Sequence, residues 1–132
     1  MTKIESDKVE VNSSAKNVFE FLADFNNFQK LMPAQVTNWT STENECTFTI
    51  SGMATIGMKI VDKTPNSVLK ISSNGKVPFD FLLTVDIESA GEKSNVKLIC
   101  EAELNVMLKM MLEKPLTNFF NILAKKLQEK YA

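Results

Sequence analysis

Histidine does not occur in this chain of 132 residues. Its absence removes the usual general base, the commonest metal ligand and every catalytic triad built on imidazole. Glycine occurs only four times, at scattered positions, so there is no glycine-rich loop to hold a phosphate group. We therefore expect no catalytic residues, no metal ion and no cofactor, and we favour a binding protein over an enzyme.

Cysteine is scarce as well. Cys46 and Cys100 are the only two, and each lies within an apolar strand pattern. They lack the close spacing of a metal-binding motif. We interpret them as buried, reduced thiols rather than as a disulfide or a nucleophile, because apolar surroundings keep a thiol protonated.

Long apolar runs and an excess of one charge are also missing. No segment approaches the length of a transmembrane helix, and residues 1–7 are polar and acidic where a signal peptide needs an apolar run. Lysine plus arginine number 15 against 16 acidic residues, and a net charge of -1 gives no electrostatic case for nucleic acid. Hydrophobic residues make up 44%, which is typical of globular proteins. We expect a single cytoplasmic domain over residues 1–132.

An amphipathic helix over residues 108–131 is the strongest pattern present. At about 100° per residue its apolar side chains fall within one arc of roughly 120°; they are Leu108, Leu112, Leu116, Phe119, Phe120, Leu123 and Leu127. Pro115 interrupts the helix, and an interior proline costs about 3 kcal/mol. Either the helix is kinked there, or residues 106–113 form a separate turn or short helix. Lys126 and Lys130 enter the apolar arc, so we expect the final turn to project beyond the sheet.

The start of the chain predicts a strand and two short helices. Residues 3–11 read as a strand of mixed polarity. Ser13 and Ser14 offer a helix N-cap, and apolar residues follow at spacings of three and four as far as Phe28. We expect a break near Asp24, because aspartate favours caps over helix interiors. Pro33 ends the helical segment.

From residue 34 onward the period of the pattern changes to two. Six further strands are predicted, at residues 35–41, 46–50, 54–60, 69–71, 79–88 and 96–104. Short turns between them indicate an antiparallel meander with one buried and one solvated face. Val36 and Trp39 fall on opposite sides in strict alternation, so the first of these strands needs a bulge or an exposed end.

Several motifs accompany this order of elements. They are Val9-Glu10-Val11 before Ser13-Ser14-Ala15-Lys16, Asp24-Phe25-Asn26-Asn27-Phe28, Met32-Pro33 ahead of the strand with Trp39, and Lys114-Pro115-Leu116 ahead of Phe119-Phe120. Together they resemble the helix-grip fold of the START/Bet v 1-like superfamily, also called SRPBCC or the polyketide cyclase/dehydrase and lipid-transport group. The resemblance implies an α+β fold. A seven-stranded antiparallel sheet would curve around a long C-terminal helix, with two short helices after the first strand.

The resemblance also implies a cavity between the sheet and the C-terminal helix for lipids, sterols, polyketides or quinones. The predicted ligand-binding residues are Phe25, Phe28, Met32, Phe48, Ile50, Ile56, Met58, Ile60, Phe79, Phe81, Leu83, Cys100, Ala102, Leu104, Leu112, Leu116, Phe119, Phe120 and Leu123. Such a surface suits an apolar ligand because desolvation drives binding. The charged strand residues, Asp80, Asp86, Glu88, Glu101 and Glu103, fall on the opposite face, so we assign no catalytic residue.

Three functions stay open. We favour the binding or carriage of a hydrophobic small molecule, such as a lipid or a polyketide- or quinone-like compound. The alternatives are a cyclase/dehydrase-like enzyme that orients a reactive chain and a protein-interaction module with a solid core. The oxygenase members of the superfamily need a histidine-containing iron site, so that branch is excluded.

Methionine-rich sequence before the long helix leaves a further question open. Met107, Met110 and Met111 either line an entrance to the cavity or fill gaps in the packing. A membrane-touching or partner-binding patch near Phe25, Phe28, Met110 and Met111 is another alternative. The oligomeric state is not predicted.

Overall fold

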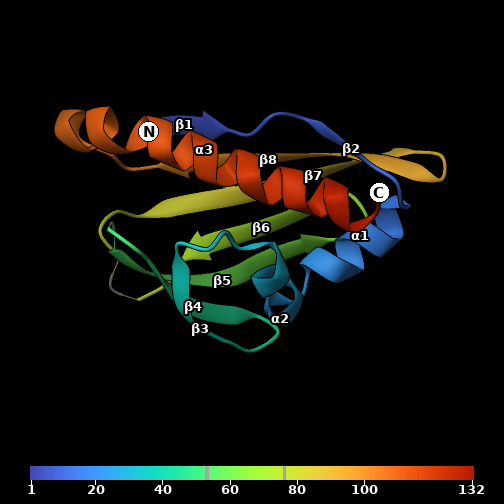
Figure 1. The fold of residues 1–132 in the computed structure, drawn as a ribbon, viewed down its shortest axis with the longest axis horizontal. Coiled ribbons are helices and arrows are strands. Elements are labelled where there is room, and N and C mark those ends of the chain that lie inside the picture. The colour runs from blue at the N-terminus through green and yellow to red at the C-terminus, as the bar shows by residue number, and fades with distance from the viewer. Residues whose placement is uncertain (53, 76) are drawn as a thin grey trace.

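The computed structural model describes residues 1–52, 54–75 and 77–132. Within them, eight strands form one antiparallel sheet, and a long helix lies across it (Figure 1). The elements are β1 (Thr2–Glu5), β2 (Val9–Val11), α1 (Ala15–Leu22), α2 (Phe25–Phe28), the 3-10 helix η1 (Gln29–Leu31), β3 (Val36–Ser41), β4 (Glu45–Ile50), β5 (Ala54–Thr64), β6 (Val68–Ser73), β7 (Phe81–Ala90), β8 (Lys93–Ala102) and α3 (Val106–Lys130). The predicted α+β helix-grip fold is confirmed.

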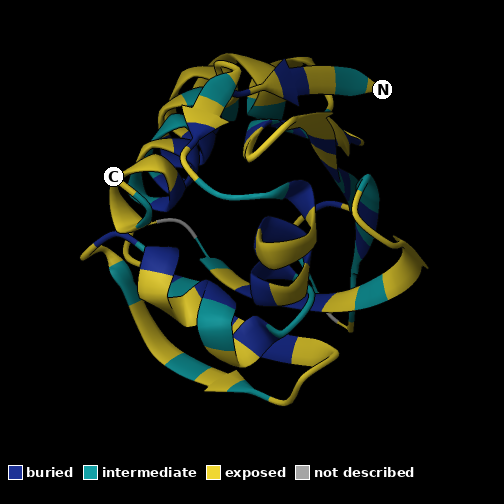
Figure 2. Cartoon of the chain, turned by 90° about the vertical axis from the view of Figure 1, so that its right-hand side faces the viewer, coloured by how far each residue is buried: buried dark blue, intermediate teal, exposed yellow. Residues whose placement is uncertain are grey.

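The sheet is a meander with its first strands added at the far edge. Its order is β1-β8-β7-β6-β5-β4-β3, and β2 also pairs with β8. Buried and exposed residues alternate along the strands, as the colours in Figure 2 show. This alternation follows from the period of two of a strand, which sends successive side chains to opposite faces. One face of the sheet is therefore free to pack against α1, α2 and α3.

The predicted first strand is divided, so the sheet has eight strands rather than seven. Glu5 pairs with Ile99 and Val9 pairs with Val96, which leaves one extra residue on the N-terminal side. Ser6 lies at this irregularity: its backbone N–H donates to the Leu98 carbonyl at 2.9 Å, and its hydroxyl accepts from the Leu98 N–H at 2.9 Å. The hydroxyl thus replaces a missing backbone acceptor, which satisfies the buried donor.

Side-chain caps divide the helical segment as predicted. The Ser14 hydroxyl accepts from the Asn17 N–H at 3.2 Å and begins α1. The Asp24 carboxylate accepts from the Asn26 N–H at 2.9 Å and begins α2, so the break expected near Asp24 is confirmed. η1 ends at Leu31, before Pro33.

The edge strand β3 contains the bulge that its sequence requires. The register with β4 shifts between Thr37 and Thr40, and Asn38 has a φ of 54°. Asparagine tolerates this left-handed conformation better than most residues do. The bulge lets the Trp39 ring stack on Phe48 of β4, with ring centroids 5.1 Å apart and an interplanar angle of 20°.

Two strand ends differ from the prediction. β7 begins at Phe81 rather than at residue 79, because the Phe81 N–H donates to the Ser73 hydroxyl at 3.2 Å where the ladder with β6 starts. β8 ends at Ala102 rather than at residue 104, opposite Phe81. The pairing of β8 with β7 therefore ends at Ala102, because β7 has no residue before Phe81 to continue it.

α3 is one continuous helix of 25 residues with Pro115 inside it. The alternative of a separate segment over residues 106–113 is therefore wrong. The Asn105 side chain caps the helix by accepting from the Leu108 N–H at 2.8 Å. This cap fixes the start of the helix ten residues before the proline, so Pro115 lies in the interior and not in a first turn.

The two ends of α3 behave in the opposite way to the prediction. At the last turns, the Lys126 ammonium donates to the Met32 carbonyl at 3.1 Å, and the Lys130 nitrogen lies 4.7 Å from the ring centre of Phe21. Tyr131 contacts the same ring edge-on. In the final turn the Gln128 amide also donates to the Glu10 carbonyl of β2 at 3.0 Å, so this turn packs on α1 and on the sheet rather than projecting beyond the sheet. The first turns extend past the ends of the strands instead (Figure 1).

Candidate functional site

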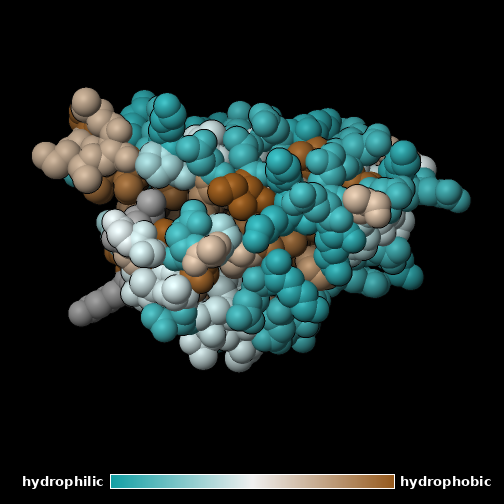
Figure 3. Space-filling view, in the orientation of Figure 1, coloured by the Kyte–Doolittle hydropathy of each residue, from teal (hydrophilic) through white to brown (hydrophobic). Residues whose placement is uncertain are grey.

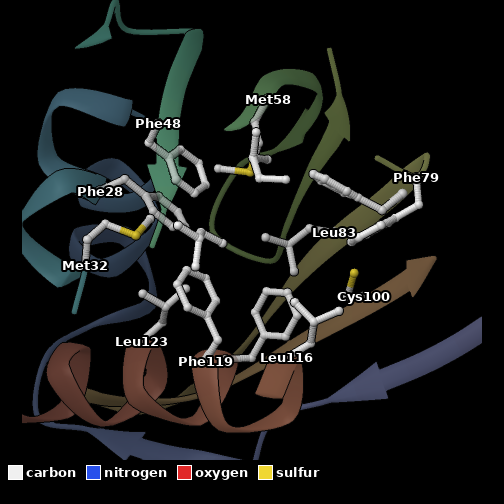
Figure 4. A pocket seen from close by; sticks show the side chains of 14 residues that line it. Phe28, Met32, Phe48, Met58, Phe79, Leu83, Cys100, Leu116, Phe119 and Leu123 are labelled. Atoms are coloured by element: carbon white, nitrogen blue, oxygen red, sulfur yellow. The ribbon is translucent and has the colours of Figure 1, made fainter. Parts of the chain in front are cut away.

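A pocket with apolar walls lies between the buried face of the sheet, α2, η1 and α3. Its lining residues come from segments far apart in the sequence; they are Phe28, Met32, Phe48, Ile50, Ile56, Met58, Phe79, Phe81, Leu83, Cys100, Leu116, Phe119, Phe120 and Leu123. Figure 4 shows their side chains converging on one space. All of them carry only carbon and sulfur beyond the backbone.

Strand pairing brings the sheet side of the pocket together. Phe48 pairs with Ile56 across β4 and β5, and Leu83 pairs with Cys100 across β7 and β8. Directly paired residues point to the same face of a sheet. The four side chains therefore form part of a single wall.

The opposite wall comes from one face of α3. Leu116, Phe119, Phe120 and Leu123 follow at spacings of three, four and seven residues, so they share a side of the helix. The rings of Phe119 and Phe120 meet edge-on with centroids 5.7 Å apart. At the end near η1, Met32 closes the pocket, and its carbonyl is the group that Lys126 binds.

The free space in this pocket is small. The volume open to the centre of a water-sized sphere is about 40 Å³. A single water needs roughly 10–15 Å³ on that measure, so the space corresponds to about three water molecules. Cavities with wholly apolar walls stay dry. The pocket in this conformation is therefore a narrow apolar gap rather than a room for a large ligand.

Every lining residue belongs to the predicted set, and five predicted residues lie elsewhere. Phe25 and Ala102 are fully buried in the packed core, and the Phe25 ring lies edge-on to Phe28. Ile60 is half-buried where the β5 register shifts, and Leu104 and Leu112 are half-buried near the start of α3. The periodicity of a strand or helix shows which face a residue is on but not its position along that face, so it could not separate these five residues from the pocket lining.

The thiol of Cys100 is the one ionisable group among the described lining side chains. Burial raises its pKa to about 12, and the neighbouring Glu101 carboxylate adds to the rise. Burial likewise raises the pKa of Cys46 to about 12, against a smaller opposing effect of a hydrogen bond with Met58. Both cysteines are free and buried, as predicted. A thiol that stays protonated is a poor nucleophile.

Charged strand residues lie away from the pocket. Asp80, Asp86, Glu88, Glu101 and Glu103 are all exposed, as the alternation predicts. Over the described ranges, no group of three or more cysteine, aspartate or glutamate side chains is placed to hold a metal ion. In the same part of the chain, no helix is long and apolar enough to cross a membrane.

Two features near the pocket escaped sequence reasoning. Trp39 stacks behind the lining residue Phe48, and its indole N–H is buried without a described hydrogen-bond partner. Lys126 connects α3 to the residue that follows η1, through the Met32 carbonyl. Only the three-dimensional arrangement brings these residues together, since Met32 and Lys126 are 94 positions apart.

Comparison of the sequence with family models and with curated proteins gives no match. The comparison with solved structures gives many. The protein XoxI from Bacillus cereus has a TM-score of 0.79 at 15% identity, over 99% of this chain and 96% of that one. A START superfamily protein from Mycobacterium smegmatis has a TM-score of 0.76 at 15% identity, over 98% and 96%.

A third similar structure is the di-domain ARO/CYC protein BexL, with a TM-score of 0.76 at 13% identity. The match covers 98% of this chain and 46% of BexL. At such identities the likeness concerns the fold alone. This chain therefore has the fold of START superfamily proteins, in agreement with the resemblance seen in its sequence.

Proposed function

We propose that this chain, with its START-type fold, binds a hydrophobic small molecule such as a lipid or a polyketide- or quinone-like compound between the sheet and α3. The observation that carries the proposal is the convergence of fourteen apolar side chains on one space. Such walls make no polar demands on a ligand, and each Å² of apolar surface buried contributes about 25 cal/mol. The names of the START and ARO/CYC neighbours support it.

Binding requires the pocket to widen, because its free volume of about 40 Å³ is far below that of a lipid. Two lining residues suit this change. Met32 and Met58 are unbranched side chains that adapt to varied shapes. The first turns of α3 are exposed and add little restraint to the wall. We expect the ligand-bound form to differ in these side chains and in the separation of α3 from β4 and β5.

A cyclase-like reaction has less support. Orientation of a reactive chain can lower a barrier, but acid-base steps need a hydroxyl, carboxylate or amine on the wall. None of the described lining residues carries one. An interaction module with a solid core is the remaining rival, and it predicts no uptake of apolar molecules.

The test is native mass spectrometry of the purified protein, combined with titration of an apolar fluorescent probe. Trp39 is the single tryptophan of the chain and stacks on Phe48, so its emission should change when the pocket is occupied. Leu83→Phe should fill the pocket and weaken uptake severalfold. Leu69→Phe is the matched control, because Leu69 is buried in the same sheet but does not line the pocket.

The proposal fails if the native chain neither retains a small molecule nor takes up the probe. Equal uptake by the Leu83 and Leu69 variants would place the binding site elsewhere. Overpacking a core costs about 1–3 kcal/mol, so thermal unfolding of both variants must accompany the titration.

A further inference from the structure

The first turns of α3 expose an apolar surface that the proposed function does not use. We call Val106, Met107, Met110 and Met111 the α3 tip; their exposed fractions are 78%, 70%, 81% and 61%. Figure 3 shows apolar atoms gathered at this end of the helix. The methionines therefore do not fill gaps in the packing, and they do not line the pocket.

Exposed apolar residues are concentrated at this end of the molecule. Over the described ranges only six large hydrophobic side chains are exposed: the four of the α3 tip, Met1 and Val61. Met1 lies at the same end, because Thr2 pairs with Ala102 shortly before α3 begins. A local group of this kind marks an interaction site more often than scattered single residues do.

The helical geometry turns the three methionines away from the protein. Met107, Met110 and Met111 are spaced by three and four residues and share one side of α3. At about 100° per residue, that side is opposite to the pocket-lining face that includes Leu116 and Leu123. No residue of the protein core can cover them without a rotation of the whole helix.

Positive charge borders the α3 tip. Residues 106–114 contain Lys109, Lys114 and Glu113, a net +1 by subtraction, in a chain whose net charge is -1. Lys109 lies within the tip segment and Lys114 follows one turn after Met110. Within the described part of the chain, neither lysine takes part in an ion pair. Apolar side chains next to unpaired lysines match the chemistry of an anionic lipid surface.

A stable protein partner is a poorer match for the same surface. A specific protein interface uses roughly 20–30 residues on each side. Its usual anchors are aromatic rings and arginine, whereas the α3 tip has no aromatic residue and the chain has no arginine. A bilayer, in contrast, needs no such anchors, and a few flexible thioether side chains can insert into it.

We propose that the α3 tip docks onto a membrane surface that contains anionic lipids. The methionines enter the boundary between headgroups and acyl chains, and Lys109 and Lys114 contact lipid phosphates. Leu116, the first pocket-lining residue of α3, follows Met111 by little more than one turn. Docking would thus bring the apolar pocket to the lipid surface.

The experiment is co-sedimentation of the full chain with vesicles of phosphatidylcholine, with and without phosphatidylglycerol. The tip variant carries Met107→Gln, Met110→Gln and Met111→Gln, because glutamine keeps the helix propensity while removing apolar area. Its partition onto phosphatidylglycerol vesicles should fall by at least about tenfold. Val61→Gln is the matched control and should leave partition unchanged, since Val61 is an exposed apolar residue of β5 outside the α3 tip.

A second variant separates the contribution of charge. The double variant Lys109→Gln with Lys114→Gln should weaken binding to phosphatidylglycerol vesicles severalfold, because each lysine near an anionic surface adds attraction. Circular dichroism establishes that all variants keep their helix. The proposal is overturned if the native chain ignores both vesicles, if the tip variant partitions like the native chain, or if light scattering shows methionine-dependent self-association in place of vesicle binding.

Docking and ligand binding can be judged separately. Probe uptake by the tip variant in solution, without vesicles, should equal that of the native chain, because no tip residue lines the pocket. Loss of vesicle binding with normal uptake supports both proposals. Vesicle binding in a chain that takes up no probe supports docking and removes the proposed ligand site.

Discussion

Cys100 lines the pocket as a protonated thiol, and Cys46 is a second buried and protonated thiol, on β4. Burial raises both pKa values from the ordinary 9.0 to about 12. The folded state therefore holds these protons more tightly than the unfolded state does. Well below pH 9 both thiols are protonated in the folded and in the unfolded state, so their ionisation does not change the free energy of unfolding. As the pH rises from 9 towards 12, the unfolded chain loses protons first, so the folded state loses stability.

The corresponding prediction concerns alkaline pH. Urea unfolding of the native chain should show a falling free energy of unfolding above pH 9, and the slope should be smaller in a variant with Cys46→Ala and Cys100→Ala. In the native chain near neutral pH, both thiols should react with a thiol reagent far more slowly than after unfolding. Fast reaction of either thiol in the folded protein would contradict the burial described above.

Two phenylalanines test the difference between a packed core and a pocket wall. Phe25 is fully buried and lies outside the pocket, whereas Phe119 faces the free space. Phe25→Ala should cost about 3–5 kcal/mol, as expected for a packed core. Phe119→Ala should cost less, because one side of its ring already lacks partners, and should strengthen uptake of an apolar probe. Equal losses of stability with unchanged uptake would indicate a solid core.

At the scale of elements, α3 continues through Pro115, although proline normally breaks or ends a helix. Pro115 cannot donate a hydrogen bond to the Met111 carbonyl four residues earlier. The helix nevertheless continues through it, since Asn105 caps the start and Leu108 and Leu112 are half-buried on the inner face. In the next turn, the Thr117 hydroxyl donates to the Glu113 carbonyl at 2.7 Å. The proline is tolerated, but its cost remains.

Pro115→Ala should therefore stabilise the protein, by up to about 3 kcal/mol. The gain arises because alanine restores the bond to Met111 and removes the clash of the ring. Urea denaturation measures the gain, and Lys114→Ala, at the exposed neighbouring position, serves as the control and should change stability by less than about 0.5 kcal/mol. An unchanged stability in the proline variant would mean that the turns before Pro115 contribute nothing to the folded state.

Across the whole molecule, the sequence predicts the buried face better than it predicts the boundaries. Alternation placed Phe48, Leu83 and Cys100 on the inner face correctly, because a strand offers only two faces. Periodicity could not separate Phe25 of α2 or Ala102 of β8 from the pocket, since it does not show how deeply a buried residue lies in the core. The Ser6 irregularity was also invisible, because it depends on a hydrogen bond to Leu98 on a strand at the other end of the chain.

Long-range contacts explain the remaining errors. The final turn of α3 is predicted to project beyond the sheet, yet Lys126 binds the Met32 carbonyl and Lys130 lies over the ring of Phe21, both far away in sequence. Exposed methionines at the other end could not be told from packing residues, because composition does not say which part of a helix the sheet covers. The fold was predictable from order and periodicity, whereas the free volume of the pocket was not.

The meander also predicts how fast the protein folds. Sheets dominated by contacts between residues distant in sequence fold in milliseconds to seconds, because the entropy of a long loop must be lost before those contacts form. Refolding followed by Trp39 fluorescence in a stopped-flow instrument should lie in that range. Refolding within microseconds would show that the pairing of β1 with β8 is not part of the rate-limiting step.

The pairing of β1 and β2 with β8 sets an order on synthesis. Residues 2–11 are synthesised before the other strands of the sheet, whereas their partner, residues 93–102, is the last of these strands to be synthesised. Until then the N-terminal segment has no strand to join, and the growing sheet has an unpaired edge that can recruit other chains. These two strands are thus synthesised before the rest of the sheet but are paired only after it, and slow translation lengthens the period in which they can aggregate.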